Sequence, residues 1–128
     1  MTEFRCDHFH LRSLDPDKAA RFYEEMFGAR RLGTMDNAGK LRVIIELGGV
    51  RLFIEAVPSG TRAAPEPPYL GLEHIGLAVT GIETVVAELK RKGAEFTADL
   101  ASPRPGTQTA FVRGPENVRI ELIERSAA

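Results

Sequence analysis

The chain contains no tryptophan, a single cysteine and no long apolar run. Because Cys6 has no second cysteine to pair with, no intrachain disulfide can form, and we expect a reducing compartment, most simply the cytoplasm. No stretch approaches the length of a membrane span, and the N-terminal MTEFRCDHF lacks the apolar core of a secretory signal. The formal net charge of −1 gives no electrostatic reason to expect nucleic acid or an anionic membrane as a partner.

Residues 4–13, FRCDHFHLRS, show the alternation that is typical of a β-strand. In a strand, residues two apart share a face, so His8, His10 and Arg12 would lie on one side. Two of the three histidines in 128 residues therefore share one face of a single strand.

A helix is predicted directly after this strand. Asp15 is suited to the N-cap and Pro16 to the first helical position, while Gly28 would end the helix in a left-handed conformation. The apolar residues at helical spacing, which we expect on the buried stripe, are Ala19, Phe22, Met26 and Phe27.

The rest of the chain follows the same order of elements. Strands are predicted at 30–35, 40–47 and 50–57, a proline-rich connector at 58–71, and further strands at 72–80, 94–100, 107–112 and 117–124. Thr80 and Glu83 predict a capping box that begins a second helix, which ends before Gly93. The apolar stripe expected on this helix comprises Ile82, Val85, Val86 and Leu89.

The two halves of the chain match at a constant offset. DHFHLRS aligns with EHIGLAV, which places His8 over His74, and RLFIEAV aligns with NVRIELI, which places Glu55 over Glu121; both offsets are 66 residues. Equal offsets in different elements indicate an internal duplication. We therefore expect one domain, residues 1–128, built from two modules at about 4–57 and 72–125 that are joined by the connector.

Each module would be an α+β unit with its helix on one face of a small curved sheet. The aliphatic rows of the strands suit the helix-covered face, so the histidines and glutamates would lie on the opposite face. Two such sheets, related by a pseudo-twofold axis, can wrap into a half-barrel whose concave cleft carries two histidines and two glutamates.

This donor set suits one divalent cation. Two neutral imidazoles and two carboxylates match a borderline metal, and the cation offsets the repulsion between the carboxylates. Four protein ligands in an octahedral sphere leave two positions for water or substrate. The donor set does not choose among Ni, Co, Zn, Mn and Fe.

The motifs DHFHLRSLDPDKAARFYEEMFG, LEHIGLAVTGIETVVAELKRKGAEF and VRIELIE resemble the vicinal oxygen chelate superfamily, which includes glyoxalase I, extradiol dioxygenases and bleomycin-resistance proteins. The resemblance covers about residues 4–123 and implies two βαβββ modules. It places the metal ligands of the family on His8, Glu55, His74 and Glu121.

Resemblance to glyoxalase I implies a lyase that transfers a proton between neighbouring carbons of a small metal-chelated substrate. Glu121 is then the first choice of base, with Glu55 as its counterpart. Arg12 stands where glyoxalase I has an arginine that contacts the carboxylate of glutathione. His10 and Arg119 are further candidates for substrate contact, although His10 could equally be a histidine packed in the sheet.

Other members of the superfamily supply the alternatives. A methylmalonyl-CoA epimerase-like enzyme would use a second carboxylate near KLRVI, where Glu46 lies close, and an extradiol dioxygenase would use iron. A bleomycin-resistance-like protein would bind a drug in the cleft without metal. The resemblance also implies a homodimer whose sites draw on both subunits.

Overall fold

The computed structural model describes residues 2–126 and divides the chain into two compact units, Met1–Ala63 and Ala64–Ala128. The first unit contains β1 (His8–Ser13), α1 (Pro16–Phe27), β2 (Arg30–Asn37), β3 (Lys40–Leu47) and β4 (Val50–Ala56). The second contains β5 (Ile75–Ala78), α2 (Ile82–Arg91), β6 (Phe96–Arg104), β7 (Thr107–Arg113), the 3₁₀ helix η1 (Pro115–Asn117) and β8 (Arg119–Arg125).

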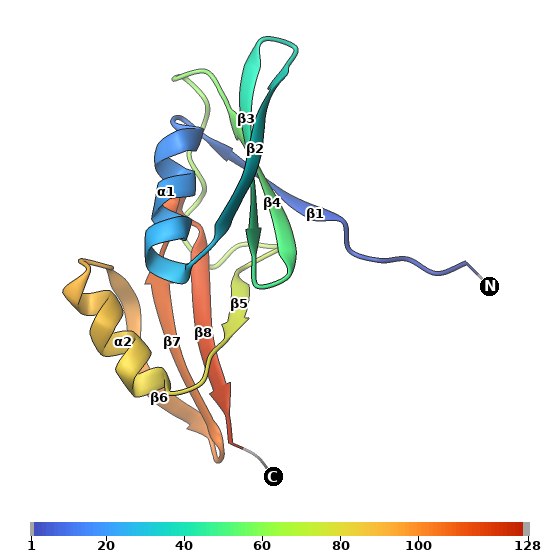
Figure 1. Cartoon of the computed structure of the whole chain (residues 1–128). Coiled ribbons are helices and arrows are strands. Elements are labelled where there is room, and N and C mark those ends of the chain that lie inside the picture. The colour runs from blue at the N-terminus through green and yellow to red at the C-terminus, as the bar shows by residue number, and fades with distance from the viewer. Residues whose placement is uncertain (1, 127–128) are drawn as a thin grey trace. The chain divides into compact units, whose positions relative to one another are not determined.

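Both units have the same βαβββ topology (Figure 1). The strand orders are β1-β4-β3-β2 and β5-β8-β7-β6, and in each sheet the first pair is parallel while the others are antiparallel. Each sheet is open, because its first and last strands do not pair with each other. The predicted α+β class with two βαβββ modules is confirmed, and the half-barrel that would join the sheets stays a prediction.

Helix α1 begins and ends where local chemistry predicts. The Asp15 side chain accepts a hydrogen bond from the Lys18 amide at 3.1 Å, and Gly28 ends the helix in a left-handed conformation at φ 70°. The buried stripe, however, comprises Pro16, Ala19, Ala20 and Tyr23. Of the predicted stripe, Ala19 is confirmed as buried, whereas Phe22, Met26 and Phe27 are only half-buried.

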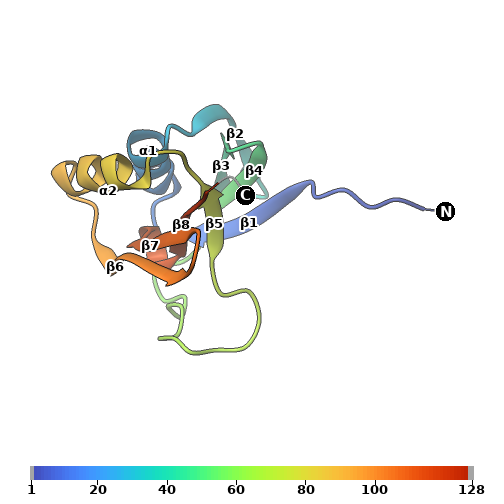
Figure 2. The ribbon, with the colours of Figure 1, turned by 90° about the horizontal axis from the view of Figure 1, so that it is seen from below.

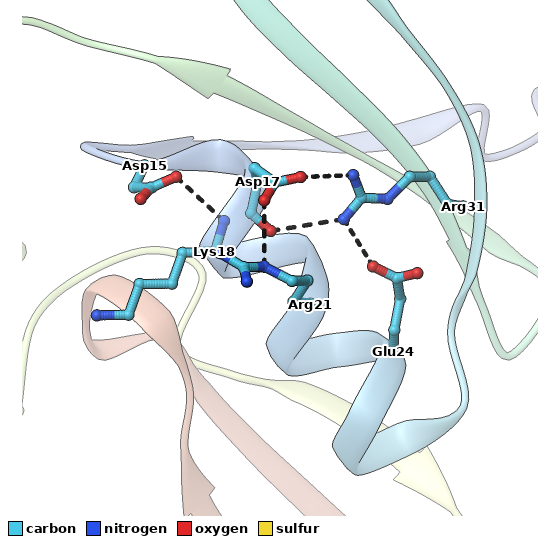
Figure 3. Close-up of polar contacts among 6 residues, drawn as sticks. All are labelled: Asp15, Asp17, Lys18, Arg21, Glu24 and Arg31. Atoms are coloured by element: carbon cyan, nitrogen blue, oxygen red, sulfur yellow. Dashed lines mark hydrogen bonds and ion pairs between the residues drawn. The ribbon is translucent and has the colours of Figure 1, made fainter.

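An ion-pair network ties α1 to β2 (Figure 3). Arg31 donates hydrogen bonds to the carboxylates of Asp17 and Glu24, both at 2.7 Å. These two acids lie one above the other on the helix, so a single guanidinium connects two turns of α1 to the next strand.

Helix α2 begins differently from the prediction. Its N-cap is Gly81, which makes no side-chain cap, so the predicted capping box of Thr80 and Glu83 is wrong. The carboxylate of Glu124 on β8 instead accepts hydrogen bonds from the amides of Gly81 and Ile82, both at 2.9 Å. The predicted buried positions Ile82, Val86 and Leu89 are confirmed, whereas Val85 is only half-buried.

The first strand of each unit is shorter than predicted. Strand β1 begins at His8, paired with Arg51 at the start of β4, so residues 4–7 lie beyond the parallel partner. In both views these residues lead away from β1 (Figures 1 and 2). Strand β5 covers only Ile75–Ala78, and His74 immediately precedes it.

The core of each unit lies between its sheet and its helix. In the first unit the central strands bury Val43, Ile45, Leu52 and Ile54, and in the second they bury Ala110, Val112, Ile120 and Leu122. Strand alternation then places Glu55 and Glu121 on the face away from the helix, as predicted.

The predicted connector, residues 58–71, forms neither helix nor strand, and the boundary between the units falls within it. Among residues 2–126, no helix has both the length and the apolar character needed to cross a membrane.

Candidate metal-binding site

In the second unit His74 and Glu121 face each other. Gly76 is the register partner of Glu121, and His74 lies two residues before Gly76 on the same side of the chain. The His74 Nε2 atom is 3.5 Å from the Glu121 Oε1 atom. Two neighbouring ligands of one ion, each at 2.0–2.2 Å from it, lie about 3 Å apart, so this nitrogen and oxygen are close to the spacing that a shared cation needs.

The other ring nitrogen of His74 contacts a neighbouring carboxylate. Its Nδ1 atom is 2.6 Å from Glu73 Oε2, and the second oxygen of Glu73 forms an ion pair with Arg119. The Arg119 guanidinium also lies over the Phe111 ring, 4.6 Å from its centroid. Arg119, a candidate for substrate contact, is thus placed against Glu73.

In the first unit Glu55 is nearly fully buried, at 7% exposure, and tightly hydrogen-bonded. Its Oε1 atom accepts from Asn37 Nδ2 at 2.8 Å, and from Arg42 Nε and Nη2 at 3.0 and 2.7 Å. The hydrogen bonds from Asn37 and Arg42 hold the pKa of Glu55 below its usual value. Glu55 is therefore held as an anion with one oxygen already occupied.

The second oxygen of Glu55 faces His10. The distance from His10 Nε2 to Glu55 Oε2 is 3.9 Å. Arg12 is the register partner of Glu55, so His10 lies two residues before that partner, the same step that separates His74 from Gly76. Burial lowers the pKa of His10 and favours the neutral imidazole, which is the form that binds a metal.

His8 makes different contacts. Its ring stacks on Phe53, with centroids 3.9 Å apart, and its Nδ1 atom is 2.7 Å from Asp7 Oδ2. His8 lies four residues before Arg12, the register partner of Glu55, so its Cα atom is displaced by about 13 Å along the strand from that partner. The structure brings His10, and not His8, next to Glu55.

Within each unit, one histidine faces one glutamate. Among residues 2–126, no three His, Cys, Asp or Glu side chains gather into a group that could hold a metal ion. Each unit supplies one histidine and one glutamate, so the four-ligand set stays a prediction. The donor types still fit a borderline divalent cation.

Sequence reasoning missed four side chains that surround these pairs, namely Asp7, Asn37, Arg42 and Glu73. Asp7 and Glu73 had a signal, because an acid directly precedes a histidine at both ends of the 66-residue offset. Asn37 and Arg42 had none, since their contact with Glu55 depends on how β2, β3 and β4 pair.

A pocket of about 340 Å³ lies within the second unit, beside Arg119. Its lining residues include Tyr69 from the connector, Arg113 and Arg119 from the ends of β7 and β8, and Asn117 from η1. This volume is in the range that holds a small molecule. In the first unit Arg12 is exposed on the face that carries His10.

Comparisons with known proteins agree with this topology. Residues 5–122 match the family model described as Glyoxalase/Bleomycin resistance protein/Dioxygenase superfamily. The chain is 27% identical over 149 residues to "Lactoylglutathione lyase" of Schizosaccharomyces pombe, covering 98% of this chain and 49% of that protein, so it spans about half of that relative's length. It is 30% identical over 132 residues to "Probable lactoylglutathione lyase" of Vibrio parahaemolyticus, covering 100% of this chain and 96% of that protein.

A solved structure extends the match to the fold. The glyoxalase family protein from Enterococcus faecalis superposes with a TM-score of 0.79 at 24% identity, covering 94% of this chain and 97% of that chain. At this level of identity the likeness concerns the fold.

Proposed function

The chain belongs to the glyoxalase/bleomycin resistance protein/dioxygenase superfamily, and from this premise we propose that it is a divalent-metal-dependent lyase of the glyoxalase I type. Its substrate would be a small molecule with vicinal oxygens, within which a proton moves between neighbouring carbons. Two relatives named for lactoylglutathione lyase support this class of reaction. One observation carries the proposal: in each unit a histidine faces a glutamate. The Nε2 atom of His74 is 3.5 Å from Glu121 Oε1, and that of His10 is 3.9 Å from Glu55 Oε2.

The proposed ligands are Glu55, His74, Glu121 and one histidine of β1. The repeat favours His8 for the fourth position, while the distance to Glu55 favours His10. A bound divalent ion would supply Lewis acidity to the chelated oxygens and so acidify the intervening C–H group.

Glu121 is the proposed base, and its surroundings differ from those of Glu55. Glu55 accepts hydrogen bonds from Arg42 and Asn37 that lower its pKa and make it a poor proton acceptor. Among residues 2–126, no arginine or lysine pairs with Glu121, whose carboxylate faces the His74 ring. A carboxylate without such a clamp can loosen and carry a proton, so Glu55 is proposed as the fixed anion and Glu121 as the moving one.

Substrate contact is proposed for Arg12 and His10 in the first unit and for Arg119 in the second. The pocket beside Arg119 supports this for the second unit, because it adjoins the side chain that holds Glu73. A homodimer whose sites draw on both subunits is proposed as well, and the lone cysteine supports a reducing, cytoplasmic location.

The first test is the metal content of the full chain. Elemental mass spectrometry should find close to one metal per subunit in the wild type, and Glu121→Ala should lose it. Glu88→Ala, which removes an exposed carboxylate from α2, is the matched control and should keep the metal. A wild type that stays empty after incubation with Ni, Co, Mn, Zn and Fe(II) would contradict the proposal and favour a metal-free binding protein.

The second test is the reaction itself. Metal-loaded protein should convert the hemithioacetal of a 2-oxoaldehyde and glutathione. Glu121→Gln should abolish turnover, and Glu55→Gln should lower it less.

The oligomeric state has its own test. Light scattering that shows only monomer at micromolar concentration would contradict the shared-site homodimer.

A further inference from the structure

Glu73 lies between His74 and Arg119 and contacts both through its carboxylate. One oxygen is 2.6 Å from His74 Nδ1, and the other forms an ion pair with the Arg119 guanidinium. The backbone carbonyl of Glu73 accepts a hydrogen bond from the Tyr69 hydroxyl at 3.3 Å. Glu73 is therefore fixed at both its backbone and its side chain.

The side chains of Arg119 and His74 both pack against the ring of Phe111. The guanidinium of Arg119 stacks over Phe111, and the His74 ring meets the same phenyl edge-on, with centroids 5.3 Å apart. Phe111 is also the register partner of Glu121 on the neighbouring strand. The two side chains that Glu73 joins are thus packed against the residue that lies across from Glu121.

This arrangement determines which nitrogen of His74 carries the hydrogen. An ionised carboxylate can only accept hydrogen bonds, so the proton of the neutral imidazole must be on Nδ1, the atom that faces Glu73. The lone pair is then on Nε2, the atom 3.5 Å from Glu121 Oε1. A metal ligand needs that lone pair, and a carboxylate on the opposite nitrogen both orients the ring and strengthens its basicity.

We propose that Glu73 is a positioning residue that, held by Arg119, keeps His74 in the Nδ1–H form with the Nε2 lone pair directed beside Glu121. The tautomer part of this proposal is independent of the proposed function, while the metal-affinity part rests on it. Arg119 would then act on His74 through Glu73 rather than as a contact to substrate alone.

The first unit holds a weaker version of the same contact. Asp7 Oδ2 is 2.7 Å from His8 Nδ1, at the equivalent sequence offset. The Asp7 side chain is 80% exposed, against 39% for Glu73, and among the described residues no arginine or lysine pairs with it. Asp7→Ala is therefore the matched comparison, for which a smaller effect is expected.

The direct test is ¹⁵N NMR of the histidine rings in the full, metal-free chain at about pH 8, where an ordinary histidine is neutral. Wild-type His74 should show a protonated Nδ1 and an unprotonated Nε2. Glu73→Ala should move the proton toward Nε2, the form favoured by free histidine in water. Glu73→Gln keeps a hydrogen-bond acceptor and should retain more of the Nδ1–H form.

The second readout is the affinity for Ni²⁺ or Mn²⁺ alone, measured by calorimetry. Glu73→Ala should weaken binding by about 10- to 100-fold, Arg119→Met by less, and Asp7→Ala least. A wild-type His74 protonated on Nε2, or a tautomer that is the same in Glu73→Ala, would overturn the proposal. If the wild type binds no metal while its tautomer is as stated, the proposed function fails and the positioning role stands.

Discussion

His10 lies across from Glu55, with its Nε2 atom 3.9 Å from the Glu55 Oε2 atom. His74 has the same relation to Glu121, yet at the sequence offset of 66 its counterpart is His8. The difference arises because β1 pairs with β4 in a register two residues away from that of β5 with β8. The two contacts that His74 combines, a carboxylate on Nδ1 and a glutamate near Nε2, are therefore divided between His8 and His10.

This division predicts which histidine holds a metal together with Glu55. His10→Ala should lower metal affinity more than His8→Ala, because the structure places His10, and not His8, beside the free oxygen of Glu55. Titration calorimetry of the two variants with one cation measures the order. The reverse order would assign the position to His8 and would require β1 to shift by two residues when metal binds.

The contact of Glu124 with the start of α2 is expected to stabilise the fold. Its carboxylate accepts from the amides of Gly81 and Ile82, and these hydrogen bonds lower the pKa of Glu124. Glu124→Ala leaves both amides without this acceptor, so the melting temperature should fall by a few degrees. Glu66→Ala, in the exposed connector, is the control and should melt like the wild type. An unchanged melting temperature for Glu124→Ala would show that solvent replaces the cap without cost.

The elements that the sequence predicts well are those whose signals are local. Asp15, Pro16 and Gly28 bound α1 as expected, because capping acts over three or four residues. The start of α2 could not be predicted in this way, since its acceptor, Glu124, comes 42 residues later than Ile82. The same holds for the contact of Arg42 with Glu55, which exists only because β3 and β4 pair in one register.

The identity of the first-unit histidine shows the limit of the periodicity argument. Alternation along β1 correctly places His8 and His10 on the face of Glu55. A shift of two residues keeps every side chain on its face, because the side-chain period of a strand is two. Alternation therefore cannot choose between the two histidines, and the repeat favours His8, whereas the observed pairing brings His10 next to Glu55.

The Arg31 network predicts how stability depends on acidity. The hydrogen bond from Arg31 lowers the pKa of Asp17 in the folded chain. The contact of Asp17 with Arg31 therefore stabilises the fold fully above the unfolded-state pKa of Asp17, near 4. This stabilisation is lost as the pH falls through the lower folded-state pKa. Arg31→Met should thus lower the urea midpoint at about pH 7 and differ less from wild type at about pH 2. Arg21→Met, which removes a more exposed partner of Asp17, should show a smaller loss. A difference in urea midpoint between Arg31→Met and the wild type that stays constant with pH would contradict this account.

The buried hydroxyl of Tyr23 is expected to contribute no net stability to the fold. The side chain is 1% exposed, and among residues 2–126 no group forms a hydrogen bond with its hydroxyl. Tyr23→Phe removes that desolvated hydroxyl and keeps the ring, so it should be neutral or stabilising, whereas Tyr23→Ala should cost about 3–5 kcal/mol through the cavity that it leaves.

The Tyr23 hydroxyl should also make the stability of the wild type depend on pH differently from that of Tyr23→Phe. Burial raises the pKa of Tyr23 above its usual value near 10. Above that pH the unfolded chain loses the phenolic proton while the folded chain keeps it, so wild-type stability should fall with rising pH through this residue. Urea midpoints measured from about pH 9 to 11 should therefore decline less steeply for Tyr23→Phe than for the wild type. Tyr69→Phe removes the half-exposed tyrosine and should keep the wild-type slope. Equal slopes for Tyr23→Phe and wild type would mean that the Tyr23 hydroxyl ionises as readily in the folded chain as in the unfolded one.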